Sequence, residues 1–410
     1  MKRARRLVAA LLLAGLSCGP ESGSGSTDAD PQGSSSSDAS ACAPSVAGVE
    51  LALQLGPGEA GLPEDGDPVR VVADADGNAI IAVTDRSSTV DVVIARISAD
   101  GTMEWSERYD GIGLDDTVLD VAVADDGGVY VAILEQYFEL EEGVRGYGVA
   151  LLALGADGTR RWRYVGTDGN PSQRLAAVAV NTDGHVALLV GNHFGPVTGL
   201  VFTMLDGDGR ELARSEIVEE RGGLSTLDAA IASSGDVLLT ATPFPELWHA
   251  RLSRSGTLLQ SELSASIDGR ATAIEAGLDD DAYVLVATGD SESGDAGLSL
   301  LHLAANGMTS VHYSHAWPTG SGYAAALALD CTGTPIIAGD IQHRDRTEDA
   351  DRQAWLAAIA PDGRELWSRT LSGPAPIVPR SLAITDAGTF WLGGLGGREL
   401  GPWLARVGVD

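Results

Sequence analysis

Two aspartates occupy the same position in a repeated pattern, and they are the residues best placed for chemistry. Asp120 and Asp228 each lie seven residues before the glycine of a tight turn, at the start of a strand that we expect to be innermost in its sheet. Carboxylates that converge at a channel mouth could act on a polysaccharide, because pairs of carboxylates carry out glycoside chemistry. The alternative is that both are solvated polar residues, because carboxylates usually stay exposed or paired. We favour this alternative and keep Asp120 and Asp228 as candidate channel-mouth residues.

Other chemical motifs are missing from the sequence. None of the seven histidines has a HExxH or other zinc spacing, and neither a Gly-Lys-Ser/Thr phosphate loop nor a Gly-x-Ser-x-Gly nucleophile elbow occurs. The segments DADGN (residues 74–78) and DGDG (206–209) look like the start of calcium loops, but they lack the remaining ligands and the distal Glu. Asp and Asn are ordinary in hairpin turns. We therefore predict no catalytic residue, no metal site and no cofactor.

The elements that position these residues are hairpins of two alternating classes. One class is represented by VRVVADADGNAIIAV, with its turn at Gly77, and the other by VVIARISADGTMEW, which ends at Trp105. Short apolar runs and apolar–polar alternation, bounded by turn residues, indicate β-strands joined by tight turns. One hairpin of each class makes a four-stranded unit of about fifty residues, and a repeat of this size favours a β-propeller.

The two ends of the chain set the expected number of blades at seven. The seventh inner hairpin has its turn at Gly388, but only one strand follows it before Asp410. Residues 49–56 (VELALQLG) are similar to an outermost strand, so we expect them to pair with residues 401–410. Such pairing would close the ring and remove exposed sheet edges. We therefore predict an all-β, seven-bladed β-propeller over residues 49–410, with four antiparallel strands per blade and the N-terminal strand completing the last blade.

Three outer turns carry a tryptophan four residues after the turn glycine, in DGTMEW (residues 100–105), DGTRRW (157–162) and DGRELW (362–367). This pattern resembles the repeats of quinoprotein-like propellers, a superfamily that includes outer-membrane assembly lipoproteins. It also resembles uncharacterised repeat propellers of secreted bacterial proteins. The resemblance implies that these tryptophans pack between blades, since large aromatic side chains dominate such contacts. Quinone-dependent enzymes of that superfamily often have an adjacent cysteine pair, which this sequence lacks.

The first residues have the pattern of a bacterial targeting segment. A basic stretch (residues 2–6) precedes an apolar stretch (7–16) that is too short to span a bilayer. Cys18 then resembles the lipidated cysteine of a bacterial lipobox, although Gly15 stands where Leu is usual. We expect a signal peptide (1–17), then the lipidated Cys18 and a disordered Ser/Gly/Asp-rich tether (18–48). The chain would be anchored at the bacterial cell envelope, at the outer membrane or cell surface rather than the inner membrane; without the lipid it would be secreted.

Cys42 and Cys331 would remain as an even pair in an oxidising compartment. The hairpin turns of every blade should lie on one face of the ring, where the N-terminal strand also begins. Cys42 would emerge on that face, and Cys331 lies in such a turn of the sixth blade. A disulfide between them would hold the closing strand in place; the alternative is two unpaired thiols.

Charge and loop distribution bear on function. The formal net charge of −31 argues against nucleic acid or an anionic membrane surface as a partner. Long loops, among them residues 135–148, should gather on the face opposite the tight turns, and binding residues commonly lie on such loops. We therefore predict a monomeric, non-enzymatic binding or scaffold module for a protein or glycan, joined to the membrane through Cys18. The alternative is a polysaccharide-active hydrolase or lyase built on the propeller.

Overall fold

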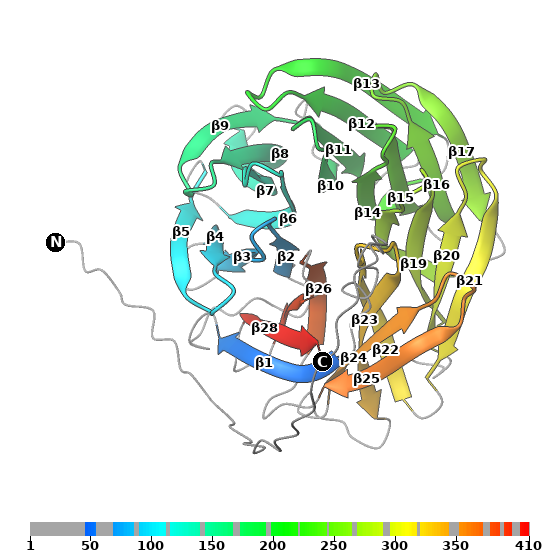
Figure 1. Cartoon of the computed structure of the whole chain (residues 1–410). Helices are drawn as coiled ribbons and strands as arrows, with labels where there is room; N and C mark the ends of the chain where they lie inside the picture. Colours follow the sequence, from blue (N-terminus) through cyan, green and yellow to red (C-terminus); the bar gives the residue numbers. More distant parts are fainter. Residues whose placement is uncertain are drawn as a thin grey trace, which may run out of the picture.

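The chain folds into a ring of blades around a central channel, as the computed structural model in Figure 1 shows. The structure describes residues 46–54, 69–85, 90–111, 115–139, 144–166, 173–193, 198–219, 222–243, 246–264, 269–289, 296–317, 320–343, 352–371, 378–385, 389–395 and 402–409. These residues form strands β1 to β28, arranged in seven sheets of four strands. This arrangement confirms the predicted seven-bladed β-propeller.

In blades one to six the strands run in chain order from the innermost to the outermost. Blade one contains β2 (Val69–Ala73), β3 (Ala79–Asp85), β4 (Asp91–Ile97) and β5 (Met103–Tyr109). Blade two contains β6 (Asp116–Val123), β7 (Val129–Glu139), β8 (Val144–Leu154) and β9 (Arg160–Val165). Blade three contains β10 (Gln173–Val180), β11 (Val186–Asn192), β12 (Thr198–Leu205) and β13 (Glu211–Glu219).

The remaining blades repeat the same arrangement. Blade four contains β14 (Leu224–Ile231), β15 (Val237–Pro243), β16 (Leu247–Leu252) and β17 (Leu258–Ser264). Blade five contains β18 (Gly269–Ala276), β19 (Ala282–Thr288), β20 (Gly297–Leu303) and β21 (Thr309–Ala316). Blade six contains β22 (Gly320–Leu329), β23 (Pro335–His343), β24 (Gln353–Ile359) and β25 (Glu365–Leu371). Blade seven contains β26 (Val378–Ile384), β27 (Phe390–Leu395), β28 (Pro402–Val409) and, outermost, β1 (Val46–Gln54).

Blade seven is completed by the N-terminal strand, as the sequence predicts. Strand β1 pairs antiparallel with β28, from Val46 opposite Val409 to Gln54 opposite Trp403. The two ends of the described chain therefore lie side by side in Figure 1, with β1 in blue and β28 in red. The strand begins three residues earlier than the expected boundary at residue 49.

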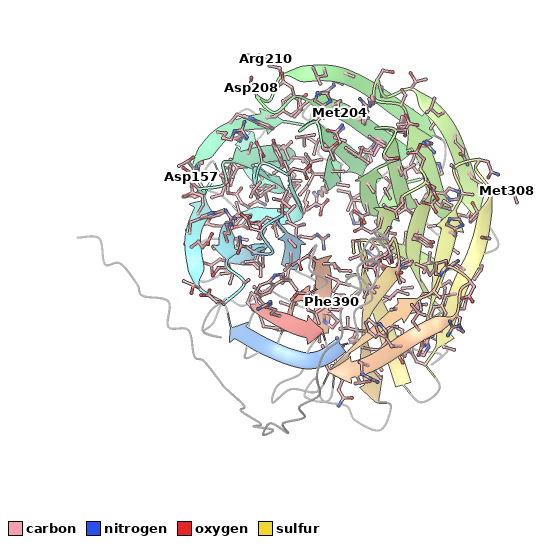
Figure 2. All side chains as sticks on the ribbon, viewed as in Figure 1. Asp157, Met204, Asp208, Arg210, Met308 and Phe390 are labelled. Carbon is pink, nitrogen blue, oxygen red and sulfur yellow. The ribbon has the colours of Figure 1, made fainter. Side chains whose placement is uncertain are left out.

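The hydrophobic core lies between the blades. One cluster joins Phe202 and Leu189 of blade three to Trp248 and Leu239 of blade four, and all four side chains are fully buried. Figure 2 shows the same layering in blade three, where Met204 lies inside the blade while Asp208 and Arg210 lie at the outer rim. Each blade therefore depends on its neighbours for the burial of its apolar faces.

Two of the outer tryptophans join adjacent blades, as the resemblance implies. Trp105 of blade one donates its indole Nε1–H to the carbonyl oxygen of Ala156 in blade two, at 2.9 Å. Trp162 of blade two makes the equivalent bond to the carbonyl oxygen of Gly207 in blade three, also at 2.9 Å. Each ring lies against the outer turn of the next blade, so the packing role of these two tryptophans is confirmed.

The prediction of a long loop over residues 135–148 is wrong for most of that segment. Strands β7 and β8 continue through it in register, from Glu135 opposite Gly148 to Glu139 opposite Val144. Aromatic and β-branched residues in the segment favour an extended backbone. Paired strands also satisfy backbone groups that an irregular loop would leave to water.

Several predictions concern residues outside the described part of the chain. Cys18, Cys42 and the segment up to residue 45 belong there, so the signal peptide, the lipid and the disulfide stay predictions. Cys331 lies exposed in the turn between β22 and β23. Since Val46 pairs with Val409, β1 begins on the face that carries the tight turns. Among the described residues, no helix has the length and apolar character needed to cross a bilayer.

Replacing Gly158 with alanine should destabilise the protein more than the same change at Gly184. Both glycines have positive φ, 79° and 75°, so each substitution should cost about 1 kcal/mol in backbone strain. A Cβ on Gly158 would lie 2.6 Å from the Trp105 ring, whereas one on Gly184 would meet nothing within 4 Å. We expect G158A to lower the free energy of unfolding by about 2–4 kcal/mol.

Urea unfolding followed by tryptophan fluorescence measures the loss in the free energy of unfolding for each of the two variants. The difference between G158A and G184A should disappear when Trp105 is replaced by alanine, because the space for the new Cβ is then open. Equal losses in the wild-type background would contradict the assigned contact.

Candidate functional site

The seven innermost strands enclose a channel with a volume of about 460 Å³. Its wall combines residues from β2, β6, β10, β14, β18, β22 and β26, and most of them are Ala, Val, Leu or Ile. Five charged side chains interrupt this apolar wall: Arg70, Asp120, Asp228, Glu275 and Arg380. The two aspartates selected from the sequence therefore both line the channel.

Asp120 connects three consecutive blades. Its Oδ2 accepts the backbone N–H of Val178 in β10 at 2.8 Å, and its Oδ1 lies 3.5 Å from the Arg70 Nε of β2. Arg70 also donates its Nε–H to the carbonyl oxygen of Leu119 at 2.9 Å. About 16% of the Asp120 side chain remains exposed to the channel. The carboxylate therefore links adjacent blades, although it can still contact a molecule that enters the channel.

Asp228 joins blades four and five in the same way. Its Oδ2 accepts the backbone N–H of Ile274 in β18 at 2.9 Å, and its Oδ1 accepts the N–H of Ala229 at 2.9 Å. The same position of blade seven holds Ser381, whose Oγ accepts the N–H of Val71 in blade one at 2.9 Å. At three of the seven positions, then, a polar side chain accepts a backbone donor of the next blade. This recurrence explains why the aspartates share a place in the repeat.

Glu275 is a third channel carboxylate that the sequence analysis missed. It lies on β18, five residues before Asp280, which occupies the turn position where the other blades have glycine. A signal was present, because the corresponding residues in the other six blades are all apolar: Val72, Ala122, Ala179, Ala230, Ala328 and Ala383. Alignment of the seven inner strands would therefore have identified Glu275 as an exception.

All three channel carboxylates have raised pKa values. Burial, together with the nearby Asp228 and Asp120 charges, raises the pKa of Glu275 to about 8. Burial and the Asp120 charge raise the pKa of Asp228 to about 7. The pKa of Asp120 is also raised, because burial outweighs the opposing effect of Arg70. Close carboxylates cannot all ionise easily, so the group shares protons near neutral pH.

This arrangement limits the chemistry that the channel can perform. A proton-sharing acidic cluster can bind a cationic group or transfer a proton. Among the described residues of the channel wall, the polar side chains are those of Arg, Asp, Glu, Ser and Thr, with no His, Cys, Tyr or Lys. Acid–base chemistry would therefore depend on the three carboxylates, two of which hold blades together.

Comparisons with known proteins identify the fold. No family model and no curated protein matches the chain. A solved ulvan lyase, from a new polysaccharide lyase family, superposes with a TM-score of 0.53 at 9% identity, over 85% of this chain and 94% of that one. A protein of unknown function from Bacteroides caccae is 17% identical over 77% of this chain and 98% of that one, with a TM-score of 0.44. The extracellular domains of Drosophila Semaphorin 1b are 10% identical over 85% of this chain and 86% of that one, with a TM-score of 0.48.

At these identities the likeness concerns the fold alone. The superposition on the ulvan lyase agrees with the propeller, and it assigns no activity to this chain. The resemblance to quinoprotein-like propellers stays a prediction, since none of the three solved structures described above is named as a member of that superfamily.

Replacing Glu275 with glutamine should weaken the pH dependence of stability. Between pH 5 and 8 the folded chain keeps a proton on Glu275, whereas the unfolded chain, with an ordinary pKa of 4.5, loses it. The folded state then binds more protons, so the free energy of unfolding falls as the pH rises through this interval. Glu275→Gln removes this titration, and at pH 8 the free energy of unfolding of the variant should exceed that of the wild type by up to about 4 kcal/mol.

Thermal unfolding at pH 5, 6, 7 and 8 measures this effect. Glu216→Gln, an exposed change on β13, is the matched control and should follow the wild type at every pH. If the unfolding temperatures of Glu275→Gln and of the wild type changed with pH in parallel, this carboxyl would not resist ionisation in the folded state.

Proposed function

We propose that this chain is a non-catalytic binding module, held at the bacterial cell envelope by a lipid on Cys18. Its partner is a protein or glycan, contacted on the face opposite the tight turns. The proposal is supported by the targeting pattern before Cys18, by the tasks of the channel aspartates and, above all, by a projecting hairpin of blade two.

The projecting hairpin carries the proposal. Strands β7 and β8 are 11 residues long, whereas β3 and β4 of blade one have seven residues each. The β6 ladder ends where Asp116 meets Glu135, and the β9 ladder ends where Val165 meets Ala150. Residues 136–139 and 144–148, which we call the arm, therefore extend beyond both neighbouring strands. A projecting pair of strands offers its edges to a partner, which can add a strand of its own.

The base of the arm is held in a defined position. Gln136 donates its Nε2–H to the hydroxyl of Tyr147 at 2.9 Å, across the paired strands. The guanidinium of Arg174, in the next blade, stacks over the Tyr147 ring at 3.9 Å from its centre. A cation over an aromatic ring contributes about 0.5–1 kcal/mol at an exposed site. The contact fixes the direction in which the arm leaves the propeller, as recognition by a rigid element requires.

A second candidate function is favoured by the channel. Three carboxylates with raised pKa values in one cavity are typical of a catalytic site, and a polysaccharide-active hydrolase or lyase would use such groups as acid and base. Two of the three accept hydrogen bonds from the next blade, which accounts for their position without catalysis. We therefore rank this function second.

Replacing Cys18 with serine should release the protein from the membrane. The thioether to a lipid requires the cysteine sulfur, so the variant would lack the acyl chains that provide membrane affinity. Fractionation of bacterial cells should move the chain from the membrane pellet to the soluble or secreted fraction. Cys331→Ser is the matched control and should leave the distribution unchanged. A Cys18→Ser chain that stays in the pellet would overturn the proposed anchor.

Removing the arm should abolish partner binding without unfolding the propeller. Because Gln136 lies opposite Tyr147, residues 137–146 can be replaced by Asn-Gly, which forms a two-residue hairpin turn. In-cell cross-linking and mass spectrometry of the membrane fraction should show one stoichiometric partner for the wild type and none for this variant. The control variant carries Thr182→Lys and Asp183→Lys on the opposite face and should keep the partner.

Two results would contradict the binding module. The first is a shortened variant that captures the same partner as the wild type. The second is release of unsaturated or reducing sugar from a polysaccharide by the wild type but not by Glu275→Gln, which would favour the second candidate.

A further inference from the structure

A cluster of acidic side chains lies where the chain passes from blade one to blade two. Asp91 begins β4, Asp110 follows the end of β5, and Asp116 begins β6. One carboxylate oxygen from each of the three lies within 4.8 Å of the others. The cluster is on the face opposite the tight turns, near the start of the arm, and is separate from the channel carboxylates.

The buried carboxylate of Asp116 is the observation that points to a ligand. The residue is completely buried, and its Oδ2 accepts the backbone N–H of Gly111 at 2.7 Å. Its Oδ1 is also buried but has no hydrogen-bond partner among the described residues. The backbone is fixed as well, because the Asp116 N–H donates to the carbonyl oxygen of Val90 at 2.6 Å. An unsatisfied buried acceptor costs about 1–3 kcal/mol, so this oxygen is unfavourable unless something binds it.

The surrounding charge is strongly negative. Arg108 bonds to Asp85 and Asp91, each at 2.7 Å. Arg163 is occupied by Glu135. In the described ranges no cationic side chain pairs with Asp110 or Asp116. The described residues around the cluster thus include five carboxyl groups, those of Asp85, Asp91, Asp110, Asp116 and Glu135, and two guanidinium groups, those of Arg108 and Arg163.

The electrostatics of Asp116 agree with this deficit. Burial raises its pKa to about 6, and the charges of Glu135, Asp91 and Asp110 add to the effect. A divalent cation would reverse this penalty, since it would place positive charge where three carboxylates meet.

We propose that Asp91, Asp110 and Asp116 bind one calcium ion at the junction of blades one and two. Calcium prefers carboxylate and carbonyl oxygens at about 2.4 Å, so two ligands on opposite sides of the ion are about 4.8 Å apart. The observed spacing of the three oxygens fits that limit. The exposed position of Asp110 leaves room for water ligands, which calcium sites often include.

The ion would act as a clamp on the crossover between the blades. Its ligands come from the start of β4 and the residue after β5, which the β4–β5 ladder of blade one joins, and from the start of β6 in blade two. The same structural position holds Gln173 in blade three and Leu224 in blade four, each eleven residues before its turn glycine, as Asp116 is. The site would therefore be special to this junction rather than a feature of every blade.

Calcium binding to the full mature chain tests the proposal. After treatment with a chelator and dialysis, isothermal titration with Ca²⁺ should show one site per chain, with Mg²⁺ binding at least tenfold more weakly. Saturating Ca²⁺ should also raise the midpoint temperature of thermal unfolding. Asp116→Asn keeps the shape of the side chain but lowers its charge, and should weaken Ca²⁺ binding by at least a hundredfold.

Two further variants keep the test decisive. Asp110→Asn changes an exposed residue, and should weaken Ca²⁺ binding at least tenfold even if Asp116→Asn folds poorly. Asp126→Asn, exposed in a tight turn on the opposite face, should bind Ca²⁺ like the wild type. The absence of Ca²⁺ binding by the wild type, or unchanged binding by Asp110→Asn, would overturn the proposal. Neither result bears on the arm or its partner.

Discussion

Closure of the ring by β1 is the interaction on which the rest of the structure depends. The apolar clusters lie between blades, so an open row of blades would leave an apolar face in water at each end. One of these clusters joins Trp391 and Leu404 of blade seven to Val71 and Ile81 of blade one. The pairing of β1 with β28 completes the blade that provides this surface, and it removes the free edge that β28 would otherwise present.

Once the ring is closed, the innermost strands face one another and their equivalent positions lie at one level. Asp120, Asp228 and Ser381 use this alignment to accept a backbone N–H from the next blade, so the contacts between blades are polar at the channel and apolar further out. The same alignment brings Glu275 close to the two aspartates. Proton uptake by these carboxyl groups is therefore coupled to the geometry of the ring, since their raised pKa values arise from burial and mutual repulsion.

The two faces of the propeller differ in structure. The tight turns form one face, where Trp105 and Trp162 each hold the outer turn of the following blade through a hydrogen bond. The other face carries the arm and the acidic junction of blades one and two. The two adjoin in blade two, where Asp116 of the junction pairs with Glu135, the residue before the arm. This division agrees with the proposed binding module, in which the face opposite the tight turns contacts the partner.

The sequence by itself determined the number of blades, the positions of the turns, the closing strand and the packing of two outer tryptophans. These features follow from local patterns, because turn glycines and alternating apolar residues report on backbone conformation and burial one hairpin at a time. Only the tertiary structure decided that Glu275 joins Asp120 and Asp228, that residues 135–148 continue as paired strands, and that Asp91, Asp110 and Asp116 meet. Such contacts depend on strand register and on the curvature of the closed ring, which bring together residues that no local pattern connects.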